Sequence, residues 1–314
     1  MTDGLTAQEL TTYLKCPRKY EFEHVAELTG DTRRNQDRFR QLLRKAICSG
    51  YSEAQSNGAD PHDAALRTLD SVWALYADAA DHHSSQQEST ENDRARAGID
   101  AYFDAVGSTH LDRIEQAAAM CGSPVIGPDI TLTAEIQGQQ VGVDVDYIMA
   151  DDSQIVGVRL TDRMWGCKVP YESDDDIAEE HLDQGDYEPE KVGTVIGARI
   201  TEKALSQYGS SSHGTGLTYL SVMETTFEAD GECEAEIEQR PMGQFLADTR
   251  QTVDDAIAWM AENITDEVYS PEEVFDQQDH WDGGFEQVVE NSCRYCSHAA
   301  GCQEAIRREV MFNV

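Results

Sequence analysis

Four cysteines have the residue type and the spacing for metal chemistry. Cys16 stands near the start of the chain, whereas Cys293, Cys296 and Cys302 follow one another closely near its end. Thiolates are the ligands that iron–sulfur clusters and many structural zinc ions take in proteins. If all four bind one centre, the fold must bring both ends of the chain together. Such a clip would close a very long loop of polypeptide.

The other four of the eight cysteines, Cys48, Cys121, Cys167 and Cys233, stand singly, with no partner at ligand spacing. We expect them to be small, buried apolar side chains. A disulfide framework is not expected in a chain of this length without a secretory signal. For the four spaced cysteines, three interpretations are open: an iron–sulfur cluster, a structural zinc ion, and thiols without a metal.

The segment Cys16-Pro17-Arg18-Lys19-Tyr20-x-Phe22, followed much later by Cys-x2-Cys-x5-Cys, resembles the iron–sulfur subgroup of RecB-like PD-(D/E)XK nucleases. AddB nuclease domains and CRISPR-associated RecB-like exonucleases belong to this subgroup. The resemblance implies a [4Fe–4S] cluster at Cys16, Cys293, Cys296 and Cys302. It also implies an α/β fold with a restriction-endonuclease-like αβββαβ core, a mixed sheet and a role in DNA processing or repair. Its specific part is confined to the two cysteine segments.

The composition is strongly acidic. Sixty Asp and Glu residues oppose 24 Lys and Arg residues, which gives a net charge of −36 over 314 residues. Because the excess is spread along the whole chain, we expect a halophilic protein of the haloarchaeal kind. Molar salt would screen the repulsion between the acidic groups on its surface. The alternative is an acidic protein with a cationic partner. No signal peptide and no apolar run of about 20 residues is present, so a cytoplasmic protein without a membrane span is expected.

Hydrophobic periodicity divides the chain into three regions that we expect to form one integrated domain. Region 1–125 is predicted to be helical, with a capping box at Thr6-Ala7-Gln8-Glu9 and a polar loop at 82–95. Region 126–240 is predicted to hold the sheet, and region 241–314 a long helix, the cysteine triplet and a short final helix. The predicted strands are 130–136, 141–149, 155–160, 218–227 and 233–239, with helices at 35–53, 94–106, 111–120, 192–205, 242–263 and 303–311.

The resemblance also assigns a place for catalysis. Such nucleases hold Mg²⁺ with an Asp on one strand and with an Asp/Glu-x-Lys on the next, whose Lys positions the attacking water. Asp146 matches the first Asp, and Asp144 is an alternative on the same face of the strand. The next strand lacks the second acid in either register, offering Val158 and Leu160 or Gly157 and Arg159. An arginine stays protonated and is a poor base.

Two further features of the resembled nucleases are absent. No histidine lies between His24 and His62, and residues 189–205 contain neither Gln nor Tyr. We therefore predict a degenerate site at Asp146 that leaves room for weakly held Mg²⁺ and is inactive or weakly active. An active Mg²⁺-dependent DNA exonuclease with migrated residues, such as Lys168 or Glu172, is one alternative. A merely solvated strand face is another.

Basic residues gather near the first cysteine despite the acidic composition. Between Lys15 and Lys45 nine basic residues stand against five acidic ones. Arg34, Arg38 and Lys45 share a helical face, so we predict that they contact DNA phosphates, on single strands or ends. Pairing with the chain's own acids is the alternative. A function of another class also fits, namely a metal-clipped, non-catalytic scaffold for a protein partner such as a helicase or another repair protein.

Overall fold

The protein is described by a computed structural model. It describes residues 4–28, 35–80, 82–122, 124–150, 154–162, 164, 169–171, 174, 176–183, 187–208, 214–227, 233–276, 284–293, 296–303 and 305–306. The side chains of 35–36 and 223–227 lie outside this description. So do Lys168 and Glu172, the two residues considered as migrated catalytic groups, and most of the predicted final helix 303–311.

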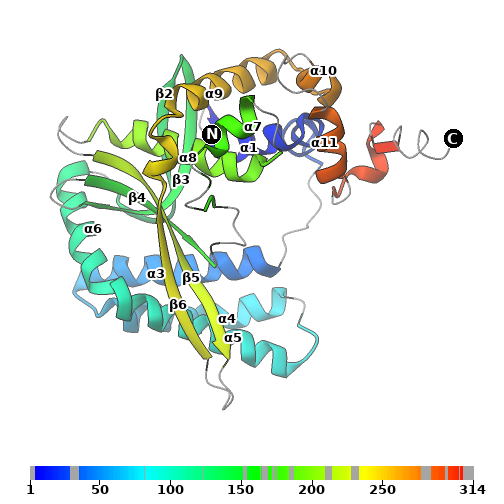
Figure 1. Cartoon of the computed structure of the whole chain (residues 1–314). Helices are drawn as coiled ribbons and strands as arrows, with labels where there is room; N and C mark the ends of the chain where they lie inside the picture. The colour runs from blue at the N-terminus through cyan, green and yellow to red at the C-terminus, as the bar shows by residue number, and fades with distance from the viewer. Residues whose placement is uncertain are drawn as a thin grey trace.

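A six-stranded mixed sheet forms the centre of the fold (Figure 1). Its strands are β1 (Leu5–Thr6), β2 (Ile126–Ile136), β3 (Gln139–Ala150), β4 (Gln154–Thr161), β5 (Gly214–Phe227) and β6 (Cys233–Pro241). They lie in the order β1-β3-β4-β5-β6, and β2 pairs with β3. The turn between β2 and β3 is made by Gln137 and Gly138, both at positive φ, which is the conformation of a tight hairpin.

The strand directions match the predicted core. Strands β2, β3 and β4 pair antiparallel in succession, whereas β4 and β5 are parallel, with Arg159 opposite Tyr219. A parallel pair needs a long crossover, which helix α8 (Pro189–Leu205) supplies. The chain therefore runs helix, three strands, helix, strand, and the predicted mixed α/β fold with its αβββαβ order is confirmed.

Helices cover the sheet from two sides (Figure 1). The helices are α1 (Ala7–Lys15), α2 (Pro17–Tyr20), α3 (Asn35–Asn57), α4 (Pro61–Ala79), α5 (Ser85–Tyr102), α6 (Ser108–Cys121), α7 (Ile177–Asp183), α8, α9 (Arg250–Thr265), α10 (Pro271–Asp276) and α11 (Gly284–Asn291). Helix α8 packs against β2 and β5 and also contacts α1 and α9. Helix α3 packs against β2, α5 packs against β5 and β6, and α6 packs against β3. No described helix combines the length and apolarity that a bilayer crossing needs.

Two element predictions need correction. The polar stretch 82–95 is not a loop, because Ser84 caps α5 by accepting a hydrogen bond from the backbone N–H of Gln87. The predicted long helix 242–263 is instead a 3₁₀ turn, Met242–Leu246, followed by α9. In addition, the acidic stretch after 172 contains the short helix α7, whose Ile177 and Leu182 are buried.

Candidate functional site

Cys16 stands at a break between two helices. The predicted capping box begins α1, with Thr6 Oγ1 accepting from Glu9 N at 3.2 Å and Glu9 Oε2 accepting from Thr6 N at 2.7 Å. The helix ends at Lys15 because Cys16 precedes Pro17, and a residue before proline avoids the helical conformation. Cys16 is accordingly extended, with φ −169° and ψ 111°.

The C-terminal cysteines fold back against this break. Cys293 and Cys296 follow α11, and the backbone N–H of Cys296 donates to the carbonyl of Cys293 at 3.2 Å. The Tyr187 hydroxyl donates to the carbonyl of Lys15 at 2.5 Å and is also hydrogen-bonded to Ser292. Figure 1 shows α1 and α11 on the same side of the molecule. The residues that directly precede Cys16 and Cys293 are thus tied to one half-buried tyrosine.

The thiols of Cys16, Cys293 and Cys296 are neighbours. Burial raises the pKa of Cys16 to about 12, and Cys293 and Cys296 raise it further, whereas the backbone N–H groups of Lys19 and Arg18 lower it. Cys302 is buried in the same segment. No group of three or more His, Cys, Asp or Glu side chains among the described residues is arranged to hold a metal ion. The thiols are therefore adjacent without forming a finished ligand set.

The other described cysteines lie elsewhere. Cys48 on α3 is fully buried, and its thiol donates to the carbonyl of Asp146 at 3.5 Å. Cys121 and Cys233 are half-buried on α6 and β6. Cys167 is outside the described residues.

Asp146 lies on β3 near the middle of the sheet and has no solvent exposure. Both of its carboxylate oxygens are occupied. Oδ1 accepts from Nε of Arg44 at 2.6 Å, and Oδ2 accepts from the backbone N–H of Leu160 on β4 at 2.7 Å. The alternative of a solvated strand face is therefore wrong for Asp146. Asp144 is exposed and accepts from the Thr131 hydroxyl at 2.8 Å.

A second carboxylate and a second arginine complete this group. Asp129 pairs with the guanidinium of Arg44, and Arg159 donates to Asp129 Oδ1 at 3.2 Å and lies 4.0 Å from Asp146 Oδ1. Asp129 sits where the β2–β3 pairing is interrupted between Ile126 and Ile130, and its φ of 64° is rare for a residue other than glycine. The bulge thus directs a carboxylate toward Arg44.

The charges of this group stabilise one another. Burial would lower the pKa of Arg44, but Asp146 and Asp129 outweigh that effect and raise it. Burial would likewise raise the pKa of Asp129, but Arg44 and Arg159 outweigh it and lower it. Arg44 and Asp129 are therefore both charged near neutral pH, and each stabilises the charge of the other. Arg44, 4% exposed, places a fixed positive charge beside Asp146, where the resemblance puts the catalytic metal.

Sequence reasoning missed part of this group. Asp129 follows a Gly-Pro pair directly before the predicted strand, a turn signal that could have drawn attention to it. Arg44 is one of the nine basic residues between Lys15 and Lys45, here called the basic strip, and nothing in the sequence singles it out. Asp162 is 5% exposed and accepts from Nε of Arg40 at 2.9 Å. The pairs Arg44–Asp146 and Arg40–Asp162 each join residues about a hundred positions apart. Local sequence patterns therefore do not reveal them.

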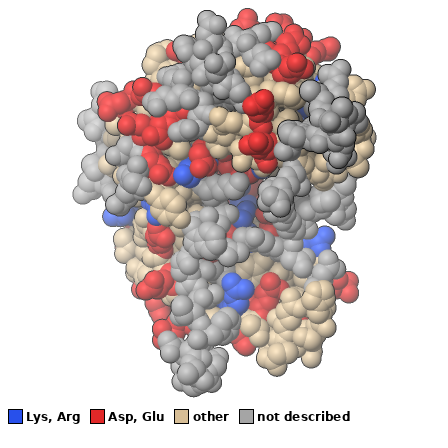
Figure 2. Space-filling model, turned by 45° about the vertical axis from the view of Figure 1, so that its right-hand side comes forward, with Lys and Arg blue, Asp and Glu red and all other residues tan. Residues whose placement is uncertain are grey.

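The basic strip is largely paired within the molecule. Lys15, Arg18 and Lys19 form ion pairs with Glu190, Glu21 and Glu23. Of the three predicted DNA contacts, Arg34 is outside the described residues, Arg38 donates to the carbonyl of Ala79, and Lys45 is exposed. On the face shown in Figure 2, described Lys and Arg side chains stand apart from one another among Asp and Glu.

Next to Asp146, a buried network joins three helices to β3. The hydroxyl groups of Tyr51 and Tyr102 lie 2.7 Å apart, those of Tyr102 and Tyr147 lie 2.8 Å apart, and Nδ1 of His110 lies 2.7 Å from the Tyr147 hydroxyl. All four side chains are buried. Burial lowers the pKa of His110 to about 4, and the positive charge of Arg113 lowers it further. The network therefore holds a neutral imidazole.

We expect this histidine to make stability depend on pH. The unfolded chain binds a proton at His110 below about pH 6.5, whereas the folded protein resists protonation down to about pH 4, so stability falls as pH drops through that window. The loss should total about 3 kcal/mol. Urea unfolding between these pH values should show a flatter profile for His110→Gln. His83→Gln, at an exposed position, should keep the wild-type slope; an equal slope in His110→Gln would contradict the assignment.

The comparisons with known proteins include a similarity to a solved structure. No protein-family model matches the chain. No curated protein matches it either. Among solved structures, the chain is similar to a "putative exonuclease" from Eubacterium rectale, with a TM-score of 0.41 and 10% identity over 85% of this chain and 83% of that one. A similarity of this size leaves the function to be argued from the chain's own residues.

Proposed function

We propose that the protein is a DNA-binding or DNA-processing protein with a RecB/AddB-like nuclease fold, an iron–sulfur clip between its termini, and a catalytic site that does not cleave. The observation that carries the proposal is the buried contact of Arg44 with Asp146. Mg²⁺ needs carboxylate oxygens with room for water and phosphate around it. Here one carboxylate oxygen of Asp146 accepts from the Arg44 guanidinium, which supplies the positive charge. The other oxygen accepts from the backbone N–H of Leu160.

Among the described residues around Asp146, Asp129 is a second carboxylate, but it is held by Arg44 and Arg159. Arg159 is the basic residue that β4 places beside Asp146. Because a guanidinium keeps its proton at any physiological pH, Arg159 cannot activate water as a base. The arrangement supports binding and rigidity at this place rather than hydrolysis. The active-exonuclease alternative would require Arg44 to leave Asp146 when DNA and Mg²⁺ bind.

The thiols of Cys16, Cys293, Cys296 and Cys302 would hold the [4Fe–4S] cluster, with zinc as the alternative. The soft thiol donors, the burial of Cys16 and Cys302, and the N–H groups of Lys19 and Arg18 directed at Cys16 fit such a centre. A bound cluster would supply a covalent cross-link between the two ends of the chain. The Tyr187 contacts with Lys15 and Ser292 would support that cross-link by fixing the two segments before assembly.

DNA contact would fall to the few basic groups that are not consumed internally. Lys45 is exposed on α3 and forms no ion pair with a described residue. A second candidate function, the protein-binding scaffold, is favoured by the internal pairing of Lys15, Arg18 and Lys19. The two candidates differ in one respect that can be measured, namely affinity for nucleic acid.

The test has a cleavage arm and a binding arm, both in molar KCl. Purified protein with Mg²⁺ or Mn²⁺ should leave labelled single- and double-stranded DNA intact, as should Asp146→Asn. Anisotropy of labelled single-stranded DNA should show binding whose salt slope falls by about one in Lys45→Glu, because one phosphate contact is lost. Lys203→Glu, an exposed lysine on α8, is the matched control and should keep the wild-type slope.

Each outcome selects one candidate. Metal-dependent degradation that disappears in Asp146→Asn would establish an active nuclease and contradict the closed site. Degradation that survives this substitution would place catalysis elsewhere. Intact DNA together with no measurable binding would favour the scaffold.

A further inference from the structure

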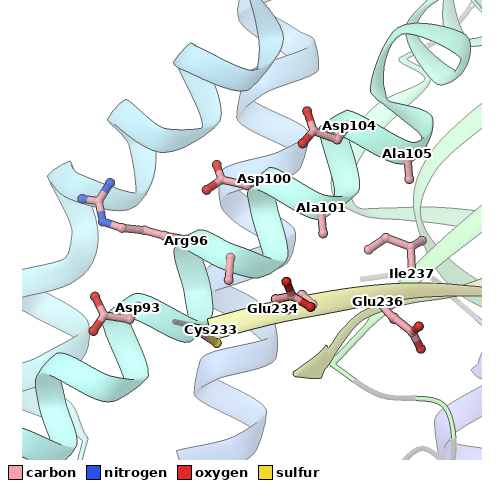
Figure 3. Close-up of a pocket in the computed structure, with 12 residues that line it drawn as sticks. Asp93, Arg96, Asp100, Ala101, Asp104, Ala105, Cys233, Glu234, Glu236 and Ile237 are labelled. Atoms are coloured by element: carbon pink, nitrogen blue, oxygen red, sulfur yellow. The ribbon is translucent and has the colours of Figure 1, made fainter. Parts of the chain in front are cut away.

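A groove lies between helix α5 and strand β6. Neither element carries a cysteine of the proposed cluster or a residue of the Asp146 group. The groove is open to solvent and has a volume of about 920 Å³. Residues of α5 spaced three and four apart line one side, so a single face of the helix borders it. The other side is lined by five consecutive residues of β6, Cys233 to Ile237. Figure 3 shows the helix and the strand facing each other across this space.

The β6 side of the groove is the free edge of the sheet. Successive side chains of a strand point to opposite faces, so a cavity above one face would be lined by alternate residues. Lining by five consecutive residues brings main-chain atoms of β6, and not one of its faces alone, to the groove. Strand β6 ends the sheet order, and no described strand pairs with its outer side. Its outward N–H and C=O groups are therefore available to an added strand.

The α5 side permits a close approach. Ala97, Ala101 and Ala105 follow one another at intervals of four along the helix and line the groove, and Ile237 adds an apolar contact from β6. Alanine side chains leave room for another backbone, and Figure 3 shows Ala101 and Ala105 on the side of the helix that faces β6. The groove therefore combines an apolar floor with a neighbouring hydrogen-bonding edge, which are features that an extended peptide needs.

The charges around the groove select the occupant. Asp93, Asp104, Glu234 and Glu236 border it without an ion pair to any described residue. Its one basic lining residue, Arg96, is paired with Asp70. A second copy of the chain adding through the same edge would bring Glu234 and Glu236 against their own equivalents, which like-charge repulsion disfavours. Phosphates of DNA or RNA are disfavoured for the same reason.

We infer that this groove binds an extended, Lys/Arg-rich segment of another protein, which adds to β6 as an edge strand. Main-chain hydrogen bonds to β6 give the affinity, the alanine floor accommodates small apolar side chains, and the four carboxylates select alternating cationic side chains. The inference goes beyond the proposed function and does not depend on it, because the groove shares no residue with the thiols, the Asp146 group or Lys45.

The experiment uses the full chain and a fluorescein-labelled peptide of about eight residues with alternating Lys and Val. Anisotropy should show saturable binding, and the matching Glu–Val peptide should not bind. A Lys–Val peptide with N-methyl groups on alternate amides keeps its charge but loses one hydrogen-bonding edge, so it should bind at least about tenfold more weakly. Bound peptide should also slow alkylation of Cys233, which lies in the groove.

Charge reversal locates the site. The double variant Glu234→Lys, Glu236→Lys should weaken binding at least about tenfold, because two of the four unpaired carboxylates become cations. The matched control Glu115→Lys, Glu179→Lys changes the net charge equally at exposed positions on α6 and α7, and it should stay within about twofold of the wild type. Unlabelled single-stranded DNA should not displace the peptide.

Several results would overturn the inference. If the N-methylated peptide bound with equal affinity, general charge attraction alone would explain the binding. An equal loss in the control variant, or unchanged Cys233 alkylation, would place binding elsewhere. A dimer in solution that dissociates in the Glu234→Lys, Glu236→Lys variant would show that the edge pairs with a second copy. Because none of these outcomes involves cleavage, the cluster or Lys45, failure here leaves the proposed function standing.

Discussion

Arg44→Met is expected to destabilise the protein by about 3–5 kcal/mol. The substitution leaves Asp146 fully buried without its cation, and removing one partner of a buried ion pair carries a cost of that size. The measurement is the free energy of unfolding from urea titration at fixed salt. Arg67→Met is the control, because Arg67 pairs with Glu53 at the surface, and exposed pairs contribute roughly 0–1 kcal/mol.

A second variant separates the lost pair from a packing defect. In the double variant Arg44→Met, Asp146→Leu both charges are gone, and replacement of a buried pair by apolar side chains of similar size is often neutral. The double variant should therefore recover most of the stability that Arg44→Met loses. A double variant no more stable than Arg44→Met would mean that Arg44 contributes through shape and not through its charge.

The same variant tests whether Arg44 takes the place of a metal ion. With the guanidinium gone, Asp146 and Asp129 leave carboxylate oxygens that a divalent cation could bind. Mn²⁺ should then stabilise Arg44→Met, by about 2.7 kcal/mol at a hundred times its dissociation constant, and should not stabilise the wild type. Adding Asp146→Asn should abolish the gain. Equal effects of Mn²⁺ on all three proteins would contradict this role.

Cys16→Ser is expected to remove the metal centre and to loosen both ends of the chain. Protein purified without oxygen should be brown and contain about four irons per chain, and the variant should be colourless. A cross-link that closes a loop of nearly the whole chain removes entropy worth about 4 kcal/mol or more from the unfolded state. Metal content, visible absorbance and unfolding should therefore change together, and protease should cut the variant after α11.

The controls come from the same set of residues. Cys293→Ser, Cys296→Ser and Cys302→Ser should behave like Cys16→Ser, whereas Cys121→Ser, at a half-buried cysteine on α6, should not. Stoichiometric zinc without iron would overturn the cluster and keep the clip. Metal-free protein whose stability is unaffected by Cys16→Ser would overturn both.

Local sequence patterns determined most of the elements of this protein. Alternating apolar residues marked five strands of the sheet, and the Thr6–Glu9 capping box and the Cys16-Pro17 pair fixed the two ends of α1. These features depend on neighbours within a few residues, so they can be read without knowing the fold. The same holds for Asp146, because its position on a strand follows from alternation alone.

The surroundings of these residues were decided only by the tertiary structure. Arg44 and Asp146 meet because α3 packs across β3, and Asp129 joins them because the β2–β3 pairing is interrupted there. The free edge of β6 likewise follows from strand order. The free-energy cost of burying a charge, and the gain from pairing it, both depend on contacts between distant segments. Residue types and their spacing therefore indicate which groups can react, but not which opposite charges neutralise them.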